Sequence, residues 1–306
     1  MPIIIDGSKV FNLIDLNDAY KKSDSIKVSN EYLKSQKVDI VGETRYVLYV
    51  AQKEFAVVAP GPDAPELVGT DESTTCHILI LVHSGSGVCC LAHLDGSYTR
   101  EGINRLLTKF KQSSLVGPEG RFELHIVGGF HEQRNFSKKL SLEVISCLLA
   151  REEELHLMTY CVCDENDEVR DGIHFPIITG LAYNTRTRAI FPAEFTYKGP
   201  DNDIRSASGF ALKQKMLDIY VNKCLVVGPF DWSVICNVNV DELDEASIRQ
   251  NFSTSPEQES KYFVEHIRST FRILMDHPQS LNSLFKNGQA RKYKWNASKL
   301  IWDRSN

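Results

Sequence analysis

The chain has 306 residues, of which 42% are hydrophobic and 25% charged, and a formal net charge of −5. This length suffices for one large domain or two ordinary ones, and the composition is that of a globular protein. The negative charge argues against nucleic acid or an anionic membrane as a partner, because phosphate groups are usually bound by a basic face.

The predicted elements, in chain order, alternate between short apolar runs and amphipathic stretches, which predicts an α/β or α+β fold. We expect helices over residues 15–35, 99–111, 137–151 and 256–276. We expect strands over residues 46–50, 55–58, 77–82, 87–93, 122–127, 156–163, 177–183 and 225–227. The run 78–82 is apolar at every position and predicts a strand covered on both faces.

The organisation of the chain predicts one compact domain over residues 1–306, in which residues 288–306 form either a packed appendage or a loosely packed tail. The amino terminus has no basic segment followed by a long apolar one, and no apolar run is long enough to span a bilayer. We therefore expect a monomer of the cytoplasm, with the nucleus as a second compartment, and no membrane partner.

The eight cysteines are expected to be reduced thiols, because no secretory signal is visible. They are Cys76, Cys89, Cys90, Cys147, Cys161, Cys163, Cys224 and Cys236. No Cys-x-x-Cys pair is present, and the histidines have no metal-ligand spacing, so neither a metal nor another cofactor is expected. Most of these cysteines are expected to be small buried hydrophobic residues.

Cys76 differs from the others because it lies between a small polar loop, residues 69–75, and a buried strand. A strand fixes the backbone of such a residue, while the loop exposes the thiol and leaves N–H groups free to bind an oxyanion. A nucleophilic thiol also needs a basic partner. His77 is adjacent in sequence, so on a strand it points to the opposite face.

His93 is the better placed partner. The strands 77–82 and 88–93 flank a turn at residues 83–87 and predict an antiparallel hairpin, which brings the start of the first strand beside the end of the second. A buried core cysteine and a satisfied histidine explain the same spacing, so the residue pattern leaves both alternatives open.

Several motifs, in order, resemble the protein N-terminal asparagine amidohydrolase family. They are Gly69–Ile78, His93–Gly96, Leu124–Phe130, His174–Pro176, Ser253–Pro256 and Phe263–Thr270. The resemblance extends from the Met-Pro amino terminus to about His277 and is weakest over residues 10–45. It implies hydrolysis of the side-chain amide of asparagine at the start of a protein or peptide. The aspartate product would then be arginylated and enter the N-degron route of protein degradation.

The Cys-to-His spacing is also similar to that of bacterial chemoreceptor glutamine deamidases, which have a threonine six residues before the cysteine. These resemblances imply that Cys76 is the nucleophile, His93 the base and Thr70 the residue that orients the imidazole. They also imply a layered fold in which helices flank a β-sandwich and the Cys/His dyad lies on a hairpin.

Recognition of a chain terminus requires an acceptor for the α-ammonium group, and a site built on polar pairing can discriminate by about 10⁴- to 10⁵-fold. Asp71 and Thr75, beside the nucleophile, are candidate substrate-binding residues. Glu265 is another candidate, although helical periodicity places it on the polar face of its helix, where pairing with Arg268 is the simpler explanation.

Two further segments are candidates for contact with the substrate. Gly128 and Gly129 follow a strand and either let the substrate backbone approach closely or form a plain turn. Ser253 lies in a motif that is typical of a helix start, and the family resemblance places it at the border of the site.

Two other classes of function remain open at this point. The chain is either a different enzyme on the same scaffold, such as a deamidase of internal glutamine or a cysteine peptidase, or a non-catalytic interaction protein whose Cys76 is merely buried.

Overall fold

The computed structural model describes residues 3–113, 115–212, 215–232 and 240–305. Cys236 lies outside these residues, as do Met1 and Pro2. The seven described cysteines are free thiols, and four of them, Cys89, Cys90, Cys147 and Cys161, are buried as expected.

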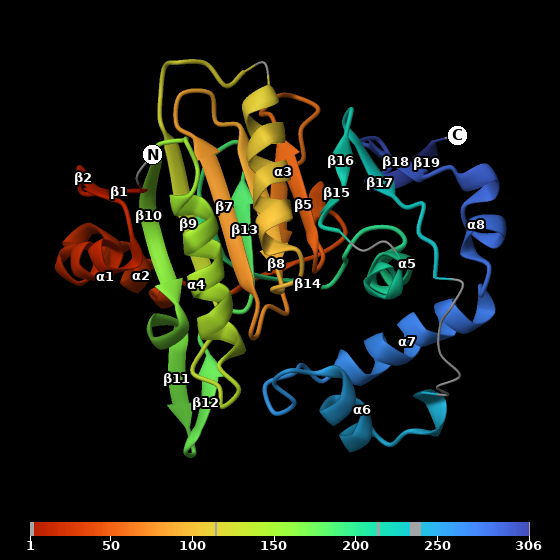
Figure 1. The fold of residues 1–306 in the computed structure, drawn as a ribbon. Helices are drawn as coiled ribbons and strands as arrows, with labels where there is room; N and C mark the ends of the chain where they lie inside the picture. The colour runs from red at the N-terminus through yellow and green to blue at the C-terminus, as the bar shows by residue number, and fades with distance from the viewer. Residues whose placement is uncertain (1–2, 114, 213–214, 233–239, 306) are drawn as a thin grey trace.

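An eight-stranded mixed sheet lies at the centre of the fold (Figure 1). Its strands, in spatial order, are β15 (Leu217–Asp218), β5 (Glu54–Val58), β8 (Cys89–Leu94), β7 (His77–His83), β9 (Phe122–Gly128), β10 (Leu155–Val162), β1 (Ile3–Ile5) and β2 (Ser8–Val10). Strands β5, β8, β7 and β9 pair antiparallel, whereas β9, β10 and β1 are parallel neighbours. The predicted hairpin is therefore present as β7 and β8.

One face of this sheet is covered by helices α3 (Thr99–Gln112) and α4 (Phe136–Leu149) (Figure 1). Leu79 and Leu81 of β7 belong to the apolar core on this side, together with Ile103 of α3 and Val144 of α4. Alternate residues of one strand point to opposite faces, so the remaining apolar residues of β7 point the other way.

The opposite face packs on a five-stranded sheet. Its strands, in spatial order, are β3 (Asp39–Val41), β14 (Ile190–Phe195), β13 (Leu181–Asn184), β6 (Leu67–Thr70) and β4 (Val47–Tyr49). Ile78 and Ile80 of β7 share a core with Val68 of β6 and Leu181 of β13. Every residue of β7 is buried, which confirms the strand covered on both faces and the layered α/β architecture.

The helix expected over residues 15–35 is two helices, α1 (Leu13–Lys22) and α2 (Asp24–Ser35). The single helix was the wrong prediction because Ser23 has an extended backbone, with φ −76° and ψ 112°, and its hydroxyl accepts the Ile26 N–H. A serine in this position caps a new helix better than it continues an old one.

The helix expected over residues 256–276 begins later, at α7 (Phe263–Asp276), and is preceded by α6 (Glu245–Phe252). Arg249 of α6 donates hydrogen bonds to the main-chain carbonyls of Pro256, Glu259 and Ser260. These bonds hold residues 253–262 as a loop, so the predicted start at residue 256 was wrong.

The carboxy-terminal residues 291–305 form a packed appendage. Strands β18 (Arg291–Asn296) and β19 (Ile301–Ser305) extend a four-stranded sheet with β16 (Tyr220–Val221) and β17 (Cys224–Val227). Trp302 is buried, and the Trp295 ring stacks on Tyr46 with 4.7 Å between centroids. The remaining elements are the short helices α5 (Asn202–Ala207) and α8 (Ser280–Ser283) and the hairpin of β11 (Asp167–Arg170) and β12 (Ile173–Pro176).

None of the helices in the described part of the chain is both long and apolar enough to cross a membrane.

Candidate active site

The β7–β8 hairpin places Cys76 and His93 on the same side of the central sheet. In the register, His77 lies opposite Leu94 and Ile78 opposite His93. Extending the register by one position puts Cys76 opposite Asp95, two residues from His93 and therefore on the same face. Both residues line one cavity of about 360 Å³.

His77 points to the other side of the sheet, as the alternation of a strand requires. Its Nε2 atom lies 2.6 Å from the Ser141 hydroxyl of α4, in the helical layer. It is thus part of the packing between sheet and helices, away from the cavity that contains Cys76.

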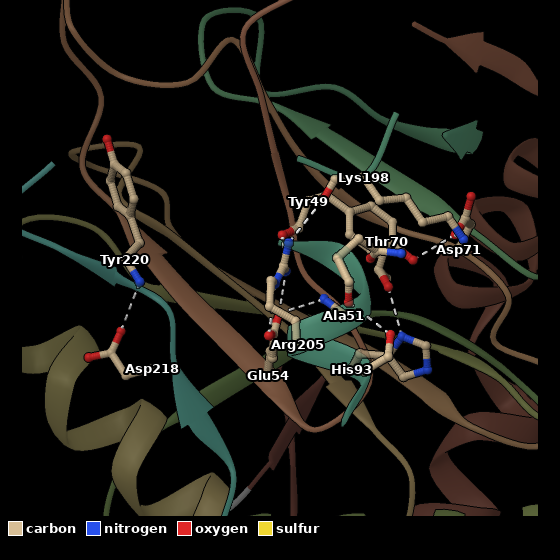
Figure 2. Close-up of polar contacts among 12 residues, drawn as sticks. Tyr49, Ala51, Glu54, Thr70, Asp71, His93, Lys198, Arg205, Asp218 and Tyr220 are labelled. Carbon is tan, nitrogen blue, oxygen red and sulfur yellow. Dashed lines mark hydrogen bonds and ion pairs between the residues drawn. The ribbon is translucent and has the colours of Figure 1, made fainter. Parts of the chain in front are cut away.

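Thr70, at the end of β6, contacts the imidazole of His93 (Figure 2). The Thr70 Oγ1 and His93 Nδ1 atoms are 2.7 Å apart, and both residues are buried. His93 Nε2 has no hydrogen-bond partner among the described residues. The contact to Nδ1 leaves Nε2 as the nitrogen that can exchange a proton in the cavity.

Burial sets the charge state of these two groups. It raises the pKa of the Cys76 thiol well above its usual value, and the carboxylates of Asp95 and Glu259 raise it further. Burial also lowers the pKa of His93 to about 4. Both groups are therefore neutral at pH 7, in contrast to a preformed thiolate–imidazolium pair.

The backbone of Cys76 is held from behind by the end of β9. The Gly129 N–H donates to the Cys76 carbonyl at 2.9 Å, and Gly128 has a φ of +135°. A Cβ atom at Gly128 would lie only 2.4 Å from the Cys76 carbonyl oxygen. Neither glycine lines the cavity, so their observed role is to hold the backbone of the loop that ends at Cys76.

The N–H groups of Thr75 and Cys76 donate to no acceptor among the described residues. Both residues line the cavity. Main-chain N–H groups in this position can bind the negative oxygen of a tetrahedral intermediate.

The carboxylate of Asp71 lines the same cavity, but it is already fully engaged. Its oxygens accept hydrogen bonds from the Tyr49 hydroxyl at 2.7 Å and the Phe195 N–H at 2.7 Å, and Oδ1 lies 3.0 Å from Lys198 Nζ (Figure 2). Burial raises the pKa of Asp71, although Lys198 opposes this. Asp71 is thus explained by its ion pair with Lys198, which also pairs with Glu72.

Glu265 lies outside the cavity. Its exposed side chain pairs with Arg272, with 3.0 Å between Oε1 and Nη1. Val264 and Phe271 are buried on the opposite face of α7, as helical periodicity predicts. Glu265 therefore has the position of a solvated helix carboxylate.

The loop between α6 and α7 forms the wall that faces Cys76. The Thr254 hydroxyl lies 2.7 Å from that of Thr75, and Ser253 lines the cavity. The Ser253 hydroxyl donates to Glu259 Oε1 at 2.5 Å. Burial raises the pKa of Glu259 to about 7.

Glu259 was missed by the sequence analysis because it fell inside a predicted helix, where a charged residue suggests a solvated face. The nearby Ser253 motif was the only hint that this segment borders the site.

Arg205, which lines the cavity, belongs to a buried ion pair (Figure 2). Arg205 of α5 pairs with Glu54 of β5, and each side chain is only 1% exposed. Arg205 also donates to the main-chain carbonyls of Tyr49, at 2.8 Å, and Lys198, at 2.9 Å. It therefore ties together three segments that surround the site.

Comparison with known proteins identifies the family of this chain. The family model for protein N-terminal asparagine amidohydrolase matches residues 34–304. The protein N-terminal asparagine amidohydrolases of Sus scrofa and Homo sapiens are each 36% identical to this chain, over 98% and 99% of it and 97% and 98% of their own lengths. The Arabidopsis thaliana protein of the same name is 30% identical over 91% of this chain and 83% of its own. The chain belongs to the protein N-terminal asparagine amidohydrolase family.

Proposed function

We propose that this protein hydrolyses the side-chain amide of an N-terminal asparagine in proteins or peptides, giving aspartate and ammonia. One observation carries the proposal: in a chain of this family, Cys76 and His93 line one cavity and Thr70 contacts the imidazole.

In the first half of the reaction, the Cys76 sulfur attacks the carboxamide carbon of the substrate. The thiol proton passes to His93 Nε2 during the attack, because both groups begin neutral. The proton then moves to the amide nitrogen, the C–N bond breaks, and ammonia leaves behind a thioester on Cys76.

In the second half, His93 removes a proton from a water molecule, and the water oxygen attacks the thioester carbon. The C–S bond breaks, the proton returns to the sulfur, and the aspartate side chain is released. The N–H groups of Thr75 and Cys76 would bind the oxyanion in both halves, and removal of one such donor typically costs about 3–4 kcal/mol of barrier.

The biological setting follows from the product. A new N-terminal aspartate would be arginylated, so the enzyme would feed the N-degron route of protein degradation. We propose that it acts there as a monomer, in the cytoplasm and nucleus.

A peptide panel tests this function. Purified protein should release ammonia from Asn-initiated peptides and none from N-acetylated or Gln-initiated ones. Release from internal glutamine would instead favour a glutamine deamidase, and peptide-bond cleavage would favour a peptidase.

Replacement of Cys76 tests the nucleophile. Cys76→Ala should lower kcat by at least about 10⁴-fold, as removal of a nucleophile does in other covalent enzymes. Cys89→Ala, which changes a buried cysteine outside the cavity, should remain active. Unchanged turnover by Cys76→Ala would overturn the thioester mechanism.

A further inference from the structure

The carboxylates around the cavity differ in whether their charge is already neutralised. Asp71 and Glu72 share Lys198, and Glu54 pairs with Arg205. Glu259 alone among these four has no Lys or Arg side chain within ion-pair distance in the described part of the chain.

The hydrogen bonds around Glu259 fix one carboxylate oxygen and leave the other available to a cationic ligand. Its Oε1 atom accepts from Ser253, whose oxygen in turn accepts the Ser255 N–H at 2.9 Å. Its Oε2 atom has no donor within hydrogen-bond distance among the described residues. The nearby Arg249 donates its hydrogen bonds to main-chain carbonyls of the same loop, and its charge lowers the pKa of Glu259 without forming an ion pair. A partly buried carboxylate without an ion-pair partner is destabilised, and a bound cation would relieve this.

Glu259 also lies where two hollows meet. It lines the cavity that contains Cys76 and also an outer groove of about 930 Å³, bordered by Phe195, Tyr197 and Tyr262. Cys76 and His93 line the inner cavity and not the groove. The Glu259 carboxylate is close enough to Cys76 to raise the pKa of its thiol.

This junction matches the shape of an N-terminal asparagine. Three groups diverge from its α-carbon: the side chain with its amide, the α-ammonium, and the carbonyl that continues into the peptide. An amide directed to Cys76 and a peptide directed along the outer groove leave the ammonium at the junction.

We propose that Glu259, oriented by Ser253, binds the substrate α-ammonium and thereby restricts the enzyme to chain termini. This inference rests on the proposed function. An acetylated terminus or an internal asparagine has no positive charge to offer, so Glu259 would remain partly buried and unpaired in those complexes.

The test compares two substrates in kcat/KM: an Asn-initiated peptide and the same peptide with a succinamoyl group, which keeps the amide but lacks the amine. Wild-type protein should prefer the amine substrate by about 100-fold or more, as expected for one partner of a buried charge pair. Glu259→Gln should lower kcat/KM for the amine substrate by about 100-fold, mainly through KM, and reduce the preference to below about 10-fold.

Two variants serve as matched controls for the same chemical change. Glu265→Gln, on the exposed face of α7, should behave as wild type. Glu72→Gln, at a carboxylate already paired with Lys198, should keep the preference for the amine. Glu259→Asp, which retains the charge, should keep more of the preference than Glu259→Gln.

The wild-type pH profile provides a test without a variant. Glu259 must be ionised to bind a cation, and its pKa is raised to about 7, so kcat/KM for the amine substrate should fall below pH 7. It should also fall above about pH 8 as the substrate amine loses its proton. The succinamoyl substrate should show neither change.

A wild-type preference for the amine that survives in Glu259→Gln, or that is lost in Glu72→Gln instead, would overturn the inference. An equal fall of kcat/KM below pH 7 for both substrates would also overturn the inference. These results differ from failure of the proposed function, which would appear as inactivity of the wild-type protein on Asn-initiated peptides or as full activity of Cys76→Ala.

Discussion

The two walls of the cavity have different origins in the sequence. The sheet wall, made of Thr75, Cys76 and His93, comes from the loop after β6 and the β7–β8 hairpin, and Thr70 of β6 contacts the His93 imidazole. The loop wall, made of Ser253, Thr254 and Glu259, comes from the connection between α6 and α7. The sheet wall contains the groups proposed to react, and the loop wall contains those proposed to recognise the terminus.

This difference suggests that reaction and recognition have different structural requirements. Covalent chemistry needs rigid geometry, which a strand packed on both faces supplies. Recognition of a charged terminus needs a carboxylate partly shielded from water, and the loop held by hydrogen bonds from Arg249 places the partly buried Glu259 at the cavity. Variants in the two walls should therefore affect different kinetic constants.

Among the variants that test this separation of reaction from recognition, His93→Gln in the sheet wall should have the largest effect on kcat. Removal of a general base should lower kcat by about 10²- to 10⁴-fold, while the preference for an amine over a succinamoyl substrate stays unchanged. Steady-state kinetics with both substrates measures this. If His93→Gln instead lost the preference for the amine substrate and kept a normal kcat, the assignment of reaction to the sheet wall and recognition to the loop wall would be wrong.

Arg205 lines the same cavity, and its replacement tests whether the fold around both walls depends on its ion pair. Arg205→Met leaves Glu54 buried without a counter-charge, so the free energy of unfolding should fall by about 3–5 kcal/mol. Urea or thermal unfolding gives this number. The double change Glu54→Leu with Arg205→Met should recover much of the loss, and failure to do so would point to the main-chain bonds of Arg205 as the dominant contribution.

The smallest expected effect is at Thr70, proposed as a positioning residue. Thr70→Val removes one hydrogen bond to His93 Nδ1 and should lower kcat by about 10-fold without changing KM. Thr70→Ser keeps a hydroxyl and should restore most of the activity. Equal losses in the Val and Ser variants would indicate a packing role at this buried position.

The sequence predicted the parts of this protein that depend on local periodicity. A continuous apolar run with a turn after it indicated the β7–β8 hairpin, and the alternation of side chains along a strand separated His93 from His77. Helical periodicity likewise placed Glu265 on the exposed face of α7. These features are properties of neighbouring residues, so the amino-acid order alone determines them.

Other features depend on contacts that the hydrophobic periodicity of the sequence does not record. The sequence suggested Asp71, near Cys76, as an acceptor for the substrate α-ammonium group. In the structure its carboxylate already accepts a hydrogen bond from Tyr49 and forms an ion pair with Lys198. Ser23 ended a helix that periodicity would have continued. In each case a tertiary contact or a side-chain cap outweighed the local pattern.

The sequence by itself thus determined the hairpin beside Cys76 and the family of this protein, because both are encoded in short ordered motifs. The tertiary structure alone decided which carboxylate is left without an ion-pair partner. Lys198 and Arg205 form ion pairs with Asp71 and Glu54, whereas Arg249 donates its hydrogen bonds to main-chain carbonyls, so Glu259 is left partly buried and without an ion pair among the described residues. Charge compensation in a buried site depends on distances across the fold, and no local spacing records them.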